Sequence, residues 1–182
     1  MAKTTWTLDP AHSEVQFKVK HLVITTITGA FTEFNGTVVT GDDFENAIIR
    51  FEASVHSIST NNEQRDTHLK SADFFEVEKY PKFFFESGSF TKKGVDNYEL
   101  KGNLTIKGIT KPITLTAEYG GTMTDPWGNV KVGFEMEGRI NRKDFGLTWN
   151  ATTEAGGILV GEEVKLHANI QLLKTAEVIV AA

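Results

Sequence analysis

The residues best suited to catalysis or metal binding in this 182-residue chain are five histidines and one short charged segment. No two histidines have the spacing of a metal-binding motif such as HxH or HExxH. Cysteine is absent, which excludes disulfides, thiol nucleophiles and cysteine-ligated zinc. We therefore expect no metal site and no cofactor. The histidines are His12, His21, His56, His68 and His167.

The charged segment Arg65-Asp66-Thr67-His68 places a cation, an acid and a base on one short predicted helix. No serine has the GxSxG pattern of an activated nucleophile, and Gly156-Gly157 lacks the following lysine of a phosphate-binding loop. Because no nucleophile, base and orienting group can be assembled from local motifs, we expect no catalytic residues and a protein that is not an enzyme.

Four polar residues are instead expected to meet the polar headgroup of a ligand at the mouth of a cavity. The alternative is structural: Arg65 with Asp66, and Arg142 with Asp144, would only tie loops to the fold. Paired charges are usually structural, so both interpretations stay open. The four expected headgroup contacts are Arg65, His68, Asn141 and Arg142.

The overall charge argues against a nucleic-acid partner. Lysine and arginine number 19 and aspartate and glutamate 24, giving a net charge of −5, whereas phosphate backbones need a basic surface. The longest apolar run, residues 178–182, is too short for a transmembrane helix. Lys3 is not followed by the apolar stretch of a signal peptide. We expect the chain as written to be cytoplasmic, and periplasmic if a signal has been removed.

Strands must position these side chains, because apolar and polar residues alternate along most of the chain. In the first such segment Val15, Phe17 and Val19 share one face, and charged or polar residues occupy the other. Asn35-Gly36 either splits the second segment or marks a bulge. The eight predicted strands are residues 13–20, 27–40, 49–55, 82–90, 98–107, 113–119, 131–140 and 163–172.

One helix is predicted between the third and fourth strands. Thr60-Asn61-Asn62-Glu63 has the spacing of a capping box, in which the threonine hydroxyl and the glutamate carboxylate satisfy free N–H groups. The helix should run to about Lys70, and Pro81 should start the next strand.

Eight successive antiparallel strands favour an all-β, up-and-down barrel formed by a single domain over residues 1–182. A two-sheet sandwich is the alternative. A barrel of this size is just wide enough to be packed or to hold one small ligand. Small residues near mid-strand favour an open interior, although a packed barrel also uses them at bends. These residues are Ala53, Gly102, Ala117, Gly138 and Ala168.

In an open barrel the apolar strand faces and the long connections would form the ligand site. The two long connections, 59–81 and 141–161, join strands three to four and seven to eight, so they should lie at the same end and form an entrance. The expected ligand contacts are Phe17, Val19, Phe31, Phe51, Ala53, Val55, Leu69, Phe74, Phe75, Phe83, Phe85, Leu104, Ile106, Leu115, Ala117, Phe134, Phe145 and Leu166.

Five ordered motifs resemble the YceI-like family of polyisoprenoid-binding, lipocalin-like barrels. The resemblance covers about residues 5–173 and leaves a tail, 174–182, outside it. The motifs are Trp6-Thr7-Leu8-Asp9 with His12-Ser13, the segment from Arg65-Asp66-Thr67-His68 to Phe74-Phe75, Tyr80-Pro81, Gly102-Asn103-Leu104-Thr105-Ile106-Lys107-Gly108, and Asn141-Arg142-Lys143-Asp144-Phe145-Gly146-Leu147.

The resemblance implies an eight-stranded antiparallel barrel whose hydrophobic tunnel holds a long isoprenoid or other lipid tail, with no catalytic residues. We therefore expect non-enzymatic binding, carriage or sequestration of a polyisoprenoid, such as a quinone or prenyl lipid, or of a fatty-acid-like lipid. The alternatives are a filled barrel acting as an interaction or stress scaffold and, less favoured, a lipid-modifying enzyme. An outer-membrane barrel is disfavoured because 3 Trp and 3 Tyr cannot build two aromatic girdles. The expected partner is the lipid alone, and homodimerisation is left open.

Overall fold

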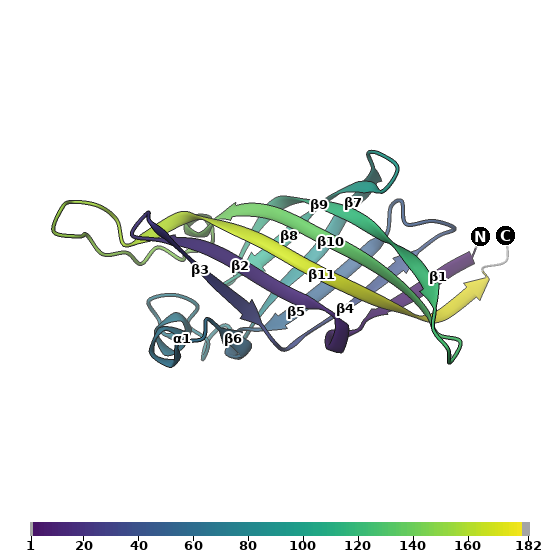
Figure 1. The fold of residues 1–182 in the computed structure, drawn as a ribbon, viewed down its shortest axis with the longest axis horizontal. Helices are drawn as coiled ribbons and strands as arrows, with labels where there is room; N and C mark the ends of the chain where they lie inside the picture. Colours follow the sequence, from purple (N-terminus) through teal and green to yellow (C-terminus); the bar gives the residue numbers. More distant parts are fainter. Residues whose placement is uncertain (1, 180–182) are drawn as a thin grey trace.

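The computed structural model describes residues 2–179, in which eleven strands wrap around one long axis (Figure 1). One α-helix and three short 3-10 turns complete this part of the chain. The elements are β1 Ala2–Leu8, η1 Pro10–His12, β2 Glu14–His21, β3 Thr25–Phe31, β4 Phe34–Thr40, β5 Ile48–Ser54, η2 Val55–Ser57, β6 Ile58–Ser59, α1 Glu63–Lys70, β7 Lys82–Lys92, β8 Asn97–Ile106, β9 Ile109–Thr124, β10 Val130–Asn141, η3 Arg142–Phe145 and β11 Val160–Ile179.

The strands close into a barrel with eight positions around its ring. The ring runs β1-β4-β5-β7-β8-β9-β10-β11, and β11 pairs back onto β1. Neighbouring strands are antiparallel throughout the ring. The predicted eight-stranded antiparallel barrel is therefore confirmed, and the sandwich is excluded.

The other three strands lengthen existing positions of the ring. Residues 172–179 of β11 pair with β1, and residues 160–169 pair with β2. In the same way β3 pairs with β2 while β4 pairs with β1. β1 and β2 thus form one long, bent strand, and β3 and β4 form another. The first bend falls at Pro10, which has no N–H to donate, and the Asp9 carboxylate accepts from the Ala11 N–H there at 3.1 Å.

Three details of the predicted strands were wrong. The sequence pattern missed β1, because one of its three inward residues is the polar Thr4, beside Trp6 and Leu8. The second strand breaks at residues 32–33, whereas Asn35 and Gly36 lie inside β4. The last predicted strand, 163–172, is too short, because β11 runs from Val160 to Ile179; residues 180–182 lie outside the described residues.

The helix ends at Lys70 as predicted, but Thr60 is not its cap. Asn62 holds that position, and its side-chain oxygen accepts from the Arg65 N–H at 2.9 Å. The Thr60 hydroxyl donates instead to Asp66 at 2.6 Å. None of the helices in residues 2–179 has the length and apolar character needed to cross a membrane.

Both long connections lie at the same end of the barrel, which confirms the prediction from strand order. The ring of Trp149, from the later connection, lies 4.7 Å from His68 and 5.3 Å from Phe74, both from the earlier one. Figure 1 shows α1 and the β10–β11 connection beside the β2–β3 turn at this end. We refer to it as the mouth end.

Aromatic packing closes the opposite end. Phe44, from the β4–β5 connection, lies 5.4 Å from the ring of Trp6 and 5.2 Å from that of Phe134. Nearby, Phe90 and Leu100 are each only 1% exposed. The side chains at this end leave little solvent access to the interior.

Candidate functional site

The interior of the barrel is an apolar cavity of about 590 Å³. Its wall takes residues from strands all around the ring, from Leu8 near the closed end to Val160 at the mouth. The cavity reaches Asn62 and Gln64, which are exposed at the start of α1. The barrel is therefore hollow and opens where the long connections meet.

Most of the apolar residues predicted as ligand contacts line this cavity. Those on strands alternate with charged or polar residues that face solvent, which is the signal that identified them, whereas Leu69, Phe74 and Phe75 come from the long connection that includes α1. The predicted contacts found on the wall are Phe17, Val19, Phe31, Phe51, Leu69, Phe74, Phe75, Phe83, Phe85, Leu104, Ile106, Leu115, Phe134 and Leu166.

Four predicted contacts are buried away from the cavity. Ala53, Val55, Ala117 and Phe145 are 1–2% exposed and belong to the packed core. The alternation of Ala53, Val55 and Ala117 correctly indicated burial, but a periodic pattern does not separate a lumen from solid packing. Phe145 lies in η3, outside any strand. The suggestion that Ala53 and Ala117 border empty volume is not supported, because neither lines the cavity.

Three wall residues that the sequence reasoning missed are informative. Ala168 lines the cavity, although it was predicted only as a small mid-strand residue. Trp149 and Leu159 come from the β10–β11 connection, where no regular alternation marks them. The apolar content of that long connection was the only available signal.

Glycines let bulky neighbours lie flat on the wall. Phe17 and Gly29 are cross-strand partners, and a Cβ on Gly29 would collide with the Phe17 ring. Leu115 covers Gly138 in the same way, from the neighbouring strand. Such side chains lie against the sheet rather than across the lumen, so the glycines keep the cavity open.

We expect Gly29→Ala to narrow the cavity without unfolding the barrel. The new methyl group displaces the tip of the Phe17 ring, a side chain that can rotate toward the lumen. The affinity for a branched apolar chain should fall about tenfold, since part of the buried area is lost. Gly133→Ala is the matched control, because the nearest atom to its Cβ is the Ile170 carbonyl oxygen at 4.0 Å. Equal titration curves for both variants and the original protein would contradict this role for Gly29.

Two of the four predicted rim residues, Arg65 and His68, belong to α1 at the mouth. Arg65 lines the cavity, and its Nε and Nη2 donate to the hydroxyl and carbonyl of Thr60, both at 2.7 Å. Asp66 accepts from the backbone N–H of Thr60 at 2.8 Å. The tie between helix and barrel that was considered for Arg65 and Asp66 thus runs through Thr60. His68 also lines the cavity, and its Nε2 lies 2.8 Å from an oxygen of Asp73.

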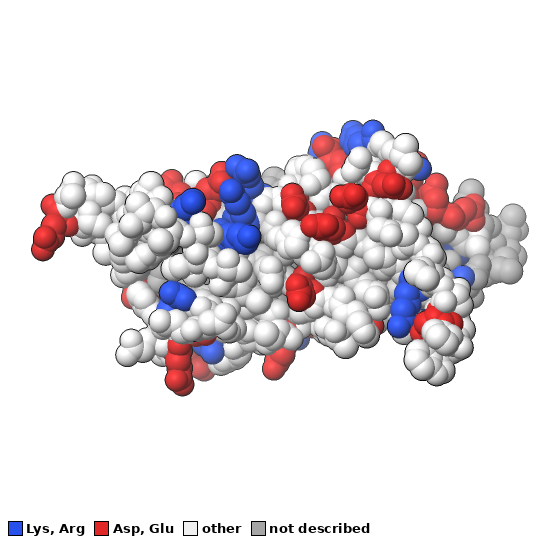
Figure 2. Space-filling model, in the orientation of Figure 1, with Lys and Arg blue, Asp and Glu red and all other residues white. Residues whose placement is uncertain are grey.

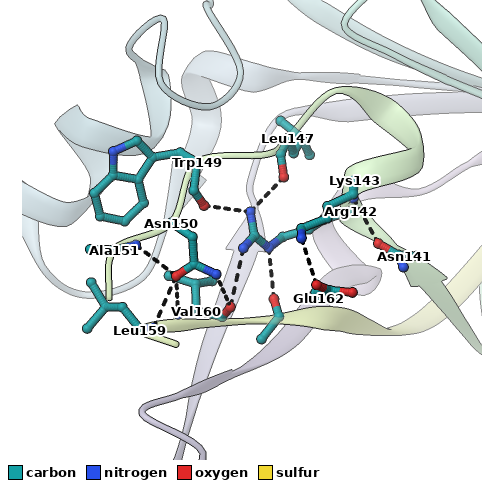
Figure 3. A network of polar contacts seen from close by, with 11 residues as sticks. Asn141, Arg142, Lys143, Leu147, Trp149, Asn150, Ala151, Leu159, Val160 and Glu162 are labelled. Carbon is teal, nitrogen blue, oxygen red and sulfur yellow. Dashed lines mark hydrogen bonds and ion pairs between the residues drawn. The ribbon is translucent and has the colours of Figure 1, made fainter. Parts of the chain in front are cut away.

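Arg142 is a buried structural centre of the mouth. It is 3% exposed, and its guanidinium donates to the carbonyls of Leu147, Trp149, Val160 and Gly161 at 2.6–3.2 Å (Figure 3). Burial lowers the pKa of this guanidinium from its usual value. Arg142 lines the cavity as well, but its partners are backbone oxygens of the loop and not Asp144.

Asn150 and Asn141 support the same loop. The Asn150 side-chain oxygen accepts from the N–H groups of Leu159 and Val160, each at 3.1 Å, and its amide donates to the Val160 carbonyl at 2.9 Å (Figure 3). Asn141 was predicted at the rim, but it is exposed, does not line the cavity and caps η3 by accepting from Lys143.

With this geometry established, the chain can be compared with known proteins. Residues 6–172 match the YceI-like domain. The chain belongs to the YceI-like family. The UPF0312 protein SA2479 of Staphylococcus aureus is 37% identical over 171 residues, which are 92% of this chain and 96% of the relative.

Solved structures share the fold of this YceI-like chain. Burkholderia cenocepacia BcnA superposes with a TM-score of 0.78 at 21% identity, over 90% of this chain and 98% of that one. A polyisoprenoid binding domain from Saccharophagus degradans, implicated in plant cell wall breakdown, gives a TM-score of 0.69 at 15% identity. It covers 93% of this chain and 98% of its own.

One group on the outer face of this YceI-like barrel has the residue types of a metal site. Ligand atoms of Glu135, Glu137 and His167 lie within 4.8 Å of one another, on β10 and β11. The two glutamates are exposed, and His167 Nε2 is 2.8 Å from Glu135. Glu135 and Glu137 do not line the cavity, whereas His167 is among the residues that border it.

Proposed function

We propose that this YceI-like protein binds and carries a long apolar lipid tail, that of a polyisoprenoid, inside the barrel without transforming it chemically. The observation that carries the proposal is the apolar cavity that extends from Leu8 to the mouth. Its volume of about 590 Å³ lies within the range of small-molecule sites. The family membership and the fold shared with a polyisoprenoid binding domain support this choice of ligand.

Apolar burial would provide the driving force. About 0.8 kcal/mol per buried methylene gives roughly 8 kcal/mol for about ten equivalents, which corresponds to micromolar affinity before association costs. Arg65 and His68 line the cavity at the mouth, and we propose that they also contact a polar headgroup there.

The arrangement of the mouth supports carriage over catalysis. Three of the ionisable groups that line the mouth are engaged by the fold: Arg65 with Thr60, His68 with Asp73, and Arg142 with backbone carbonyls. Catalysis would require a nucleophile or base facing the substrate. The lipid would therefore be cargo, and no further cofactor is proposed.

Mass spectrometry of the protein purified from a host that makes polyisoprenoids tests the proposal. Native spectra should show one lipid per chain, and an organic extract should contain an isoprenoid or another long-chain lipid. A chain that is bare after purification, and stays bare after incubation with prenyl lipids, would instead favour a scaffold without a ligand. Conversion of added lipid to a new product would favour the alternative of a lipid-modifying enzyme.

A further inference from the structure

The turn between β2 and β3 exposes three consecutive apolar side chains at the mouth end. Leu22, Val23 and Ile24, which we call the apolar tip, are 37%, 70% and 79% exposed. Figure 1 shows this turn projecting beside the β10–β11 connection. A turn that only reverses the chain normally carries glycine, asparagine or aspartate, so the composition of this one needs another explanation.

The backbone of the apolar tip is held in an unfavourable conformation. Leu22 and Val23 have φ angles of 53° and 68°, in the left-handed region that a β-branched residue such as valine rarely adopts. The conformation is fixed by the Leu22 N–H, which donates to the Leu159 carbonyl at 2.9 Å. The fold therefore holds exposed apolar groups in place, a feature that is typical of functional sites.

The apolar tip lies beside the mouth of the cavity, but none of its three residues lines the cavity. His21, which precedes it, lines the cavity, and so does Leu159, its hydrogen-bond partner. Ile158, the neighbour of Leu159, is 45% exposed. An apolar chain leaving the cavity at this point would meet apolar side chains.

The outer face beside the apolar tip has a basic row with acidic side chains on both sides of it: Glu163, one row nearer the tip, is exposed and lies 3.4 Å from Arg139. Arg139, Lys165 and Lys18 are cross-strand neighbours that form a basic row over β10, β11 and β2. The next rows away from the tip contain the acidic Glu137 and Glu135. Figure 2 shows a blue group on this face, nearer the mouth end than a group of red side chains.

We propose that the apolar tip inserts into the surface of an anionic lipid bilayer, where the protein exchanges its lipid. The proposal rests on the proposed function, because a bilayer is where a lipid cargo resides. Inserted apolar groups and a basic row near anionic headgroups are the two components of interfacial binding, and the rows that contain Glu137 and Glu135 would lie farther from the membrane. Three side chains are too small a patch for a stable protein interface.

Flotation with vesicles tests the tip directly. The full chain should float with vesicles of phosphatidylcholine and phosphatidylglycerol, and the double variant Val23→Asp, Ile24→Asp should lose about tenfold or more of its partitioning. Val95→Asp and Trp127→Asp are matched controls, because these side chains are 86% and 83% exposed in hairpins at the closed end. Thermal melts should agree among all four proteins, since the replaced side chains are exposed.

The rate of prenyl-lipid transfer out of vesicles should fall for the tip variant, while its affinity for the same lipid added from ethanol without vesicles stays unchanged. If the tip variant loses flotation but the original protein binds no prenyl lipid, the proposed function is refuted and insertion of the tip is supported. Equal flotation of tip variant and original would overturn the inference, as would an equal loss in the two controls. A change of oligomeric mass without vesicles would assign the tip to contact between copies and overturn it too.

Discussion

Ala168→Trp is expected to lower the affinity for a long apolar chain at least about 100-fold while leaving a folded barrel. Ala168 lines the cavity on β11, between its cross-strand partners Met136 and Val15. An indole at this position would occupy the volume that the ligand needs, in space that no core side chain fills. Titration of stripped protein with a prenyl alcohol, followed by calorimetry, measures the loss.

Ala53→Trp provides the matched control. Ala53 is 1% exposed and does not line the cavity, so the larger side chain must displace packed neighbours. Overpacking of this kind costs about 1–3 kcal/mol or more, so the melting temperature should fall clearly. Full binding by Ala168→Trp would place the ligand outside the barrel. A strongly destabilised Ala168→Trp would show that the interior is already packed there.

Arg142→Met should produce the largest loss of stability among single substitutions at the mouth. Methionine has a similar reach but no donors, so the carbonyls of Leu147, Trp149, Val160 and Gly161 lose their shared partner. The Val160 carbonyl keeps its bond from the Asn150 amide, but losing the other charge-assisted bonds costs about 3 kcal/mol or more, which corresponds to a fall of roughly 6–12 °C in melting temperature. Thermal unfolding followed by circular dichroism gives the value.

Arg139→Met separates this effect from the loss of charge. Arg139 has the same side chain on the barrel surface, where it is 65% exposed and lies 3.4 Å from Glu163. Exposed ion pairs of this kind contribute about 0–1 kcal/mol. A similar melting temperature for the two variants would show that the Arg142 network does not hold the mouth together.

Alternation of apolar and polar residues was sufficient to predict the ring of the barrel, because each strand has one face toward the interior and one toward water. It failed at β1, where the inward Thr4 interrupts the apolar pattern. Polar groups do occur inside the barrel here: the Thr40 hydroxyl accepts from Trp6 Nε1 at 3.2 Å. The break between β3 and β4, at residues 32–33, was also not predicted, since an Asn-Gly pair such as Asn35-Gly36 can occupy a strand as well as a turn.

The site was predictable where it is built from strands and much less so where it is built from loops. Phe17 and Phe85 were identified by their spacing alone. Arg142 was recognised as a polar residue of the mouth, but its carbonyl partners depend on how the loop from 146 to 161 folds back, which no local pattern encodes. For Ala117, burial was predictable, whereas its distance from the lumen depends on how neighbouring side chains pack.

Affinity measured against chain length tests most directly whether the cavity holds an apolar tail. Stripped protein is titrated with prenyl alcohols of increasing numbers of isoprene units, and Trp149, whose ring lies at the mouth, provides a fluorescence signal. Each added unit should raise the affinity about tenfold or more, because every buried methylene contributes about 0.8 kcal/mol, until the cavity is full. An affinity that does not change with chain length would contradict binding of the tail inside the barrel.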